Sequence, residues 1–260
     1  MTLRLAMWSG PRNISTALMR AWENRPDCTV TDEPLYAAYL AATGLDHPLR
    51  DEVIAAGDSD WQRVATFLTG PVPDGRAIWY QKHMTHHLLP GMSLDWVHAL
   101  TNVLLIRDPA QVVASYLKSR ATVTPADIGL LQQVVLYDEL CHAGAGEPPL
   151  VIDADDFLRD PAAHLRALCA HLGVDFDEER MLHWPPGPRA SDGVWAPAWY
   201  AAVWQSTGFE PWRPRKPRLD RAAQSVADAC RPAYERLRAA RLRVEADGAR
   251  IGTRPLDTKQ

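Results

Sequence analysis

Short apolar runs alternate with amphipathic segments along most of the chain. The apolar runs predict strands at Leu3–Trp8, Thr29–Asp32, Ala77–Gln81, Asn102–Ile106 and Leu150–Asp153. Between them, apolar positions recur every three to four residues and predict helices at Ile14–Asn24, Leu35–Ala42, Asp60–Leu68, Trp96–Leu100, Pro109–Ser119, Asp127–Ala143 and Pro161–Gly173. This alternation is typical of βαβ units. We therefore expect an α/β, three-layer fold with a mainly parallel central sheet of about five strands flanked by helices.

The C-terminal part of the chain differs in pattern and in charge. From Leu219 onward, small and apolar residues recur in a three-four rhythm, which predicts a long helix, and Pro232 predicts a kink or break near Arg231. Residues 211–260 contain 13 Lys+Arg and 6 Asp+Glu, a net charge of +7. Because the whole chain has a net charge of −4, the first 210 residues have a net charge of −11. The basic face is either solvated or in contact with an anion or an acidic surface. We predict one domain over 1–260, with a core at 1–210 and a basic helical extension at 211–260, frayed from Gly248. The apolar seam of the extension packs on the core or forms a homodimer contact.

An anion-binding loop is predicted between the first strand and the first helix. Residues 8–22 read WSGPRNISTALMRAW, in which a Gly-Pro turn precedes the helix that Ser15 and Thr16 open. Helix N-termini have unpaired N–H groups and a partial positive charge, and Arg12 adds a full charge. A nucleoside-triphosphate loop would carry a Lys before the hydroxyl residue that binds Mg²⁺, and here no Lys precedes Thr16. The loop therefore favours a terminal phosphate that brings no metal.

A second candidate phosphate contact follows the strand Asn102–Ile106. Arg107 stands at the exit of this strand, and Ser115 follows eight positions later on the helix that Pro109 opens. A guanidinium and a hydroxyl in these places can hold one phosphate from two sides.

Together these segments resemble the PAPS-dependent sulfotransferases, PAPS being 3′-phosphoadenosine 5′-phosphosulfate. The pattern Ser-x-Pro-Arg-x-x-Ser-Thr from Ser9 resembles the 5′-phosphosulfate loop of that family, with Ile14 where the family usually has Gly. The resemblance implies donor contacts from Arg12, Asn13, Ile14, Ser15 and Thr16. The stretch LLIRDPAQVVASYLKSR resembles the 3′-phosphate segment, which implies that Arg107 and Ser115 bind that phosphate.

A third segment, residues 186–208, resembles the part of the family that folds over the nucleotide. Arg189 and Gly193-Val194-Trp195 stand where the family has an Arg and Gly-Asp-Trp, although the spacing is one residue shorter and the Asp is replaced. The resemblance implies that Arg189 is a further ligand of the 3′-phosphate. Residues 182–200 are also similar to the sulfotransferase-like half of proteins named after branched-chain aminotransferases. Nothing in the chain marks the Schiff-base Lys and cofactor phosphate loop that an aminotransferase needs.

Sulfuryl transfer needs a base for the acceptor proton, a cation for the leaving oxygen and anchors for the nucleotide. Arg12 and Lys82 are the candidate cations. Glu33, just past the second strand, stands where several sulfotransferases carry a catalytic Glu, whereas His83 resembles the His of the cytosolic small-molecule enzymes. The ordinary pKa of His is already near neutral, whereas Glu needs burial or a negative neighbour such as Asp32 to reach it. Glu33 can also simply cap the helix that follows Pro34. Both bases remain candidates.

Several partners are not expected. His83 and His87 are four apart on a predicted helix, but neither an H-E-x-x-H motif nor a third ligand accompanies them, so we expect no metal. The basic residues are not interleaved with aromatic ones, which argues against nucleic acid. No apolar run is long enough to cross a bilayer and the N-terminus lacks a signal pattern, so we expect a cytoplasmic protein without a membrane partner. The four cysteines are scattered, which excludes a C-x-x-C zinc or disulfide framework.

The sequence therefore predicts a sulfotransferase that moves a sulfuryl group from PAPS to a hydroxyl or amine of a small acceptor without a metal. Tyr36, Tyr39, Trp61 and Trp79 suggest a pocket for a partly apolar acceptor. Two alternatives remain. One is a nucleotide-binding protein without turnover, suggested by Ile14 and the irregular third segment, and the other is a P-loop kinase, which would need Mg²⁺ and a Lys in the loop.

Overall fold

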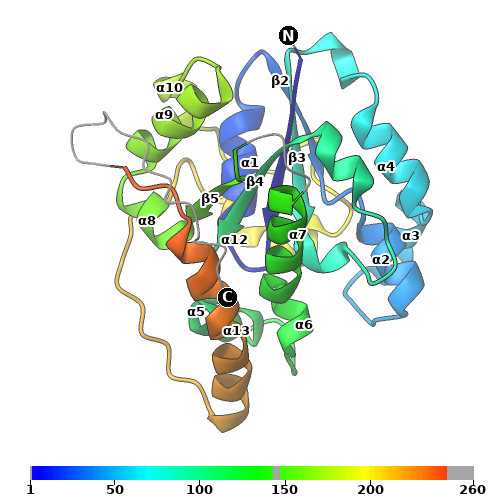
Figure 1. Cartoon of the computed structure of the whole chain (residues 1–260), viewed down its shortest axis with the longest axis vertical. Coiled ribbons are helices and arrows are strands. Elements are labelled where there is room, and N and C mark those ends of the chain that lie inside the picture. Colours follow the sequence, from blue (N-terminus) through cyan, green and yellow to red (C-terminus); the bar gives the residue numbers. More distant parts are fainter. Residues whose placement is uncertain (1, 143–146, 245–260) are drawn as a thin grey trace. The chain divides into compact units, whose positions relative to one another are not determined.

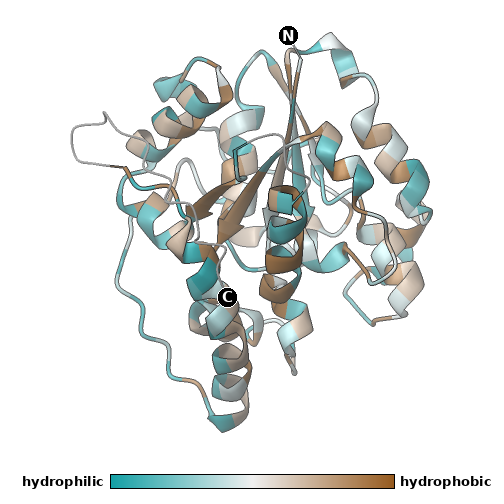
Figure 2. Cartoon of the chain, viewed as in Figure 1, coloured by the Kyte–Doolittle hydropathy of each residue, from teal (hydrophilic) through white to brown (hydrophobic). Residues whose placement is uncertain are grey.

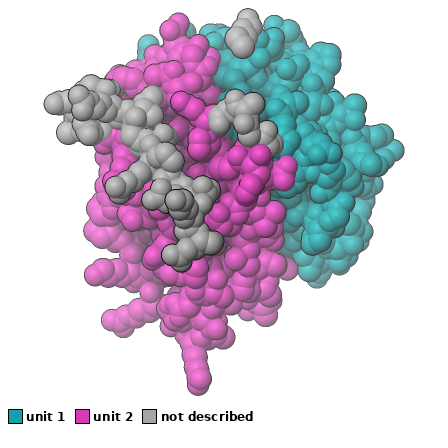
Figure 3. All heavy atoms as spheres, in the orientation of Figure 1, with its two compact units in different colours: residues 1–8, 15–102, 179–209 teal, residues 9–14, 103–178, 210–260 magenta. Residues whose placement is uncertain are grey.

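A computed structural model describes residues 2–142 and 147–244 of the chain. These residues form two compact units, each assembled from several segments (Figure 3). Unit 1 contains residues 2–8, 15–102 and 179–209, and unit 2 contains residues 9–14, 103–142, 147–178 and 210–244. The segment from Gly248, which was predicted to fray, lies outside the described residues. Ala143, the last residue of the helix predicted from Asp127, also lies outside them.

The fold is α/β, as predicted, with a five-stranded parallel sheet flanked by helices. The strands are β1 (Leu3–Ser9), β2 (Cys28–Asp32), β3 (Ile78–Met84), β4 (Thr101–Ile106) and β5 (Leu150–Asp153), in the order β2-β3-β1-β4-β5 (Figure 1). All five strands were predicted from the sequence, and the hydropathy colouring shows hydrophobic residues most clearly along β4 and β5 (Figure 2). Only β3 differs much from the prediction, because it continues through Lys82, His83 and Met84.

In unit 1, β2 and β3 pair in parallel, with Cys28 opposite Ile78 and Asp32 opposite Lys82. Helix α1 (Ser15–Glu23) packs on both strands through apolar residues such as Leu18 and Trp22. The unit also contains α2 (Tyr36–Thr43), α3 (Arg50–Ala56), α4 (Trp61–Thr69), α11 (Ala196–Trp199) and α12 (Ala201–Trp204). Helix α10 (Glu178–Leu182) begins at Glu178, which is assigned to unit 2, and its other residues belong to unit 1. Three short 3₁₀ helices, η1 (Pro73–Gly75), η2 (Thr85–His87) and η3 (Asp95–Ala99), lie in its loops.

In unit 2, β4 and β5 pair in parallel, with Ile106 opposite Asp153. Its helices are α5 (Pro109–Tyr116), α6 (Pro125–Ile128), α7 (Leu130–His142), α8 (Ala154–Arg159), α9 (Pro161–Leu172) and α13 (Arg221–Ala239). Helix α13 packs against α5, α6, α7 and β5 through a seam that includes Ala223, Cys230 and Leu237. The predicted seam of the extension is therefore buried within this unit.

Two expectations about helices were wrong, and of the kink or break predicted at Pro232 the break does not occur. The helix predicted over residues 127–143 is two helices, because Gly129 adopts a left-handed conformation (φ 77°) between α6 and α7. Helix α13 runs through Pro232 without the predicted break. The short helix predicted near Trp96 is present as the 3₁₀ helix η3. His83 and His87 do not share a helix, since His83 belongs to β3 and His87 ends η2.

Within the described residues, none of the helices combines the length and the apolar character needed to span a bilayer.

Gly10 lies against the backbone that precedes α7. A Cβ atom at Gly10 would stand 2.2 Å from the carbonyl oxygen of Ile128, closer than such atoms approach in proteins. We expect Gly10→Ala to lower the free energy of unfolding by roughly 3 kcal/mol, the upper part of the usual range for overpacking. Urea unfolding followed by circular dichroism measures this loss.

Gly70→Ala is the matched control, because its nearest atom would lie 3.1 Å from the new Cβ. It should lose less than ~1 kcal/mol. Equal losses for the two variants would contradict the close approach at Gly10.

Candidate active site

The residues predicted to act on the donor or the acceptor are found in both units. Unit 2 contains Arg12, Asn13, Ile14, Arg107 and Ser115, and unit 1 contains Ser15, Thr16, Glu33, Lys82, His83 and Arg189. Each unit brings several of its own residues into direct contact.

In unit 2, Arg12 contacts both residues of the second predicted phosphate segment. The Arg12 Nε donates a hydrogen bond to Ser115 Oγ (3.2 Å), and Arg107 Nη1 donates to the backbone carbonyl oxygen of Arg12 (2.9 Å). We call Arg12, Arg107 and Ser115 the arginine cluster. The backbone of Arg12 is left-handed (φ 54°), a conformation that non-glycine residues rarely adopt. Such strain requires support from its surroundings, and the Arg107 contact provides part of it.

The Arg107 guanidinium is buried and held in a fixed orientation. Its Nε and Nη2 donate to Gln111 Oε1 (3.3 and 3.2 Å), and Gln111 Nε2 donates in turn to Asp155 Oδ2 (2.8 Å). Asp108 caps α5 by accepting from the backbone of Ala110 and Gln111, and this fixes the start of the helix that carries Ser115.

The electrostatics of this cluster favour an anion. Burial lowers the pKa of Arg107, and the positive charges of Arg215 and Arg12 add to that effect, although Asp155 and Asp108 oppose it. Burial also lowers the pKa of Arg12. A phosphate would relieve both the desolvation and the repulsion between like charges. Arg215 was not anticipated from the sequence.

Asn13 serves the same loop in two ways. Its Nδ2 donates to the carbonyl oxygen of Leu105 in β4 (3.2 Å), and its Oδ1 accepts from the backbone N–H of Ile14 (2.9 Å). Asn13 therefore ties the predicted donor loop to the strand that leads to Arg107.

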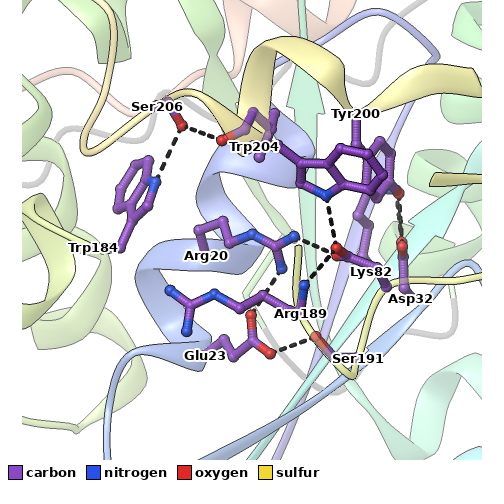
Figure 4. A network of polar contacts seen from close by, with 12 residues as sticks. Arg20, Glu23, Asp32, Lys82, Trp184, Arg189, Ser191, Tyr200, Trp204 and Ser206 are labelled. Atoms are coloured by element: carbon purple, nitrogen blue, oxygen red, sulfur yellow. Dashed lines mark hydrogen bonds and ion pairs between the residues drawn. The ribbon is translucent and has the colours of Figure 1, made fainter. Parts of the chain in front are cut away.

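In unit 1, one buried ammonium joins two carboxylates and a phenol. Lys82 Nζ donates to Asp32 Oδ1 (2.8 Å), Glu33 Oε1 (2.5 Å) and the Tyr200 hydroxyl (2.9 Å), which uses all three of its N–H groups. Figure 4 shows Lys82, Asp32 and Tyr200 of this group. We call these four residues the lysine cluster. The pairing of β2 with β3 places Asp32 opposite Lys82, and the Glu33 N–H donates to the Lys82 carbonyl (2.9 Å). Glu33 is also left-handed (φ 40°).

The pKa of Glu33 in the lysine cluster lies above its ordinary value. Burial raises the pKa of this carboxyl, and the Asp32 charge adds to the rise, while Lys82 and Tyr200 oppose it. Burial alone would lower the pKa of Lys82, but the Asp32 and Glu33 charges outweigh it and hold that pKa well above its ordinary value. Burial, with Asp32, also raises the pKa of Tyr200 well above its ordinary value. The ammonium therefore stays charged and the phenol stays protonated at neutral pH.

His83 lies in a different environment. Its ring stacks on Trp8 with centroids 4.1 Å apart, and Nε2 contacts Gln81 Oε1 (3.2 Å). The side chain is 1% exposed, and burial, with the charge of Lys82, lowers its pKa to about 3. His86 and His87 are also buried and neutral, with a pKa of about 3 for His86 and a pKa well below the ordinary value for His87. In the described part of the chain, no group of three or more His, Cys, Asp or Glu residues could hold a metal ion.

The third predicted segment is fastened to α1 within unit 1 (Figure 4). Arg20, which is 1% exposed, forms ion pairs with Glu23 (2.9 Å) and Asp192. Asp192 Oδ2 accepts from the backbone N–H of Arg189 (2.8 Å) and from Trp204 Nε1 (2.9 Å). The Arg189 guanidinium donates to the carbonyl oxygen of Pro185 (3.2 Å). The segment that carries Arg189 is therefore held by buried charges rather than by apolar contacts alone.

The structure also shows which residues the sequence did not reveal. Tyr200, Arg20 and Asp192 were not singled out, and only the position of Arg20 within the apolar part of α1 hinted at a buried charge. Of the four residues proposed to line an acceptor pocket, Tyr36 and Tyr39 belong to one buried cluster with Trp195 and Tyr200. Trp79 instead contacts Phe67, with ring centroids 5.1 Å apart.

Comparison with known proteins identifies the family. A family model described as "Sulfotransferase domain" matches residues 3–241. The chain belongs to the sulfotransferase family. The family resemblance predicted from the sequence is thereby confirmed.

Individual members of the comparison agree on the fold. The chain is 36% identical over 232 residues to branched-chain-amino-acid aminotransferase-like protein 2 of Arabidopsis thaliana, an alignment that covers 89% of this chain and 40% of that protein. The chain thus spans less than half the length of this relative. The sulfotransferase from Alicyclobacillus acidocaldarius has a TM-score of 0.56 at 14% identity, covering 96% of this chain and 100% of its own. The sulfotransferase domain from the curacin biosynthetic pathway has a TM-score of 0.54 at 17% identity, covering 88% and 97%.

Replacing Lys82 by Met removes the charge that holds the two carboxylates. We expect Lys82→Met to lower the free energy of unfolding at pH 8 by roughly 3–5 kcal/mol, because it leaves buried charges unpaired. The loss should shrink at pH 5.5. Without the ammonium, the folded carboxylates have a pKa above their unfolded values of about 4, so the folded chain binds more protons and gains stability as the pH falls.

Urea unfolding at both pH values measures the effect. Lys118→Met is the control, because Lys118 is exposed, and it should change stability by less than ~0.5 kcal/mol at either pH. A loss for Lys82→Met that does not depend on pH would contradict the charge balance of the lysine cluster.

Proposed function

We propose that this chain is a sulfotransferase that transfers the sulfuryl group of PAPS to a hydroxyl or amine of a small acceptor without a metal. The observation that carries the proposal is the arginine cluster. In unit 2, the Arg12 guanidinium donates to the Ser115 hydroxyl (3.2 Å), and the Arg107 guanidinium donates to the backbone carbonyl oxygen of Arg12 (2.9 Å). These groups are the donors that bind phosphate oxygens with the best geometry.

The proposed donor site accounts for several features of unit 2. Arg107 and Ser115 would bind the 3′-phosphate, and Arg12 would neutralise charge on the leaving 5′-phosphate. Asn13 and Ile14 would add polar and backbone contacts on the same loop, with Ser15 and Thr16 next in the chain. We further propose Arg189 as an accessory ligand of the 3′-phosphate, since its segment is held in place by Asp192.

We propose Glu33 as the general base. Its carboxylate takes the proton of the acceptor O–H or N–H, the acceptor atom forms a bond to sulfur, and the bond from sulfur to the phosphate oxygen breaks. The electron pair of that bond leaves with adenosine 3′,5′-bisphosphate. A base works best when its pKa approaches the working pH, and burial moves Glu33 in that direction. His83 is moved the opposite way, to about 3.

Lys82 then has an indirect role in the proposed reaction. Its three N–H groups are occupied by Asp32, Glu33 and Tyr200. A contact with the leaving phosphate, the role expected from the sequence, would require Lys82 to release one of these partners. We therefore propose that Lys82 tunes and orients Glu33.

The small acceptor, the cytoplasmic location and the homodimer stay predictions.

Donor binding is the first test. In a thermal-shift titration in EDTA, we expect adenosine 3′,5′-bisphosphate to stabilise the chain, by about 2.7 kcal/mol at 100 times its Kd, and ATP and ADP to have little effect. Arg107→Ala should weaken binding of the bisphosphate by about 2–3 kcal/mol, or roughly 30- to 150-fold, because it removes charged hydrogen bonds.

Arg221→Ala is the control for this experiment, because Arg221 is exposed at the start of α13. It should bind like the unmodified chain. Stabilisation by MgATP instead of the bisphosphate would favour a kinase, and binding of the bisphosphate without transfer to any acceptor would favour a nucleotide-binding protein.

The base is tested by turnover. Release of adenosine 3′,5′-bisphosphate from PAPS is followed with a panel of phenols, alcohols and amines. Glu33→Gln should lower kcat by roughly 100-fold or more, because it removes the proton acceptor, and should leave bisphosphate binding within a few-fold. His83→Gln should retain most of the turnover. The reverse result would assign the base to His83.

A further inference from the structure

The Tyr200 hydroxyl contacts every charged group of the lysine cluster. It accepts hydrogen bonds from Lys82 Nζ (2.9 Å) and Trp195 Nε1 (3.3 Å), and it donates to Asp32 Oδ2 (2.7 Å). Glu33 Oε1 lies 3.5 Å from the same oxygen. A phenol has a single hydrogen, so it serves only one of the two carboxylates at a time, and the shorter distance gives it to Asp32.

The position of Tyr200 is fixed from several sides. Its backbone N–H donates to the Ala196 carbonyl (2.8 Å), and its own carbonyl accepts from Trp204 (2.9 Å). Its ring packs in the buried aromatic cluster with Tyr36 and Trp195. Trp204 is in turn bonded to Asp192, which Arg20 holds to α1. The hydroxyl is thus presented to the carboxylates by a segment that is itself anchored.

We propose that Tyr200 is a positioning residue, whose hydroxyl engages Asp32 and so leaves Glu33 as the carboxylate of the pair that takes the acceptor proton. The proposal rests on the proposed function of Glu33 as base. It adds a reason why one of two neighbouring carboxylates, both bonded to the same ammonium, would be the one that reacts. In this proposal Tyr200 acts through the two carboxylates and takes no proton from the acceptor.

The proposal makes predictions of opposite sign for two variants. The charged and titratable groups that act on Glu33 are Lys82, Asp32 and Tyr200. Removing the hydroxyl takes a donor from the carboxylate pair, so the pair should bind its first proton more tightly. Replacing Asp32 by Asn removes a negative charge beside Glu33, so Glu33 should bind a proton less tightly.

The experiment compares Tyr200→Phe and Asp32→Asn with the unmodified chain. The pH dependence of kcat/KM for sulfuryl transfer gives the acid limb, and ¹³C-carboxylate NMR, with Glu33→Gln for assignment, gives the titration without requiring turnover. In both measurements, Tyr200→Phe should move the midpoint up by roughly one pH unit. Asp32→Asn should move the ¹³C midpoint of Glu33 down by at least as much.

Tyr234→Phe is the matched control. The Tyr234 hydroxyl also donates to a buried carboxylate, Asp153 Oδ2 (2.7 Å), but in unit 2. Its loss should leave the acid limb and the Glu33 signal within about 0.2 pH unit of the unmodified chain, which separates a local effect from a general loss of stability.

If Tyr200→Phe does not fold, the unmodified chain still tests the contact. The ¹³Cζ signal of Tyr200 should then shift with the same midpoint as the carboxylate pair. A folded Tyr200→Phe with an unchanged midpoint, or a ¹³Cζ signal that stays flat through that midpoint, would overturn the proposal. Carboxylate shifts as expected without transfer to any acceptor would instead contradict the proposed function, while supporting the hold of Tyr200 on the pair.

Discussion

The candidate site in unit 1 depends on the hydrogen bonds that the buried ammonium of Lys82 donates. It holds Asp32 and Glu33 from the end of β2 and Tyr200 from the third segment, and its side chain is 1% exposed. The parallel register of β2 and β3 sets Asp32 opposite Lys82, so the sheet itself positions the pair. Because two carboxylates share one ammonium, one negative charge is left over in a buried place. Burial and then the charge of Asp32 raise the pKa of Glu33, although Lys82 opposes the rise.

Unit 2 presents the opposite electrostatic situation. Its arginine cluster gathers positive charge, which Asp155 and Asp108 only partly offset, and burial adds to the unfavourable energy of the cations. An anionic ligand is the simplest way to relieve it. The backbone is left-handed at Arg12 (φ 54°) and at Glu33 (φ 40°), as it also is at Leu49 and Asp74 among the described non-glycine residues. We interpret the left-handed backbone at Arg12 and Glu33 as a consequence of placing these functional side chains just after β1 and β2.

Much of this was predictable from the sequence, for local reasons. The strands are apolar runs, and Arg12, Arg107 and Ser115 lie in loops and on a helix whose boundaries Gly, Pro and Asp specify. Tyr200 could not be found in this way, because its contacts with Asp32 and Glu33 join residues 168 and 167 positions apart. A buried Tyr among tryptophans also looks like ordinary core. The extension of β3 through Lys82 was missed because charged residues are rarely buried in a strand unless they are paired with an opposite charge. Here Asp32 and Glu33 provide that charge.

A crystal structure of the chain with adenosine 3′,5′-bisphosphate, grown in EDTA, would test the proposed donor site most directly. The proposal predicts that the oxygens of the 3′-phosphate lie within hydrogen-bond distance, about 3 Å, of the Arg107 guanidinium and the Ser115 hydroxyl, with Arg12 turned from Ser115 toward a phosphate. A nucleotide bound elsewhere, with the contact between Arg12 and Ser115 unchanged, would contradict it.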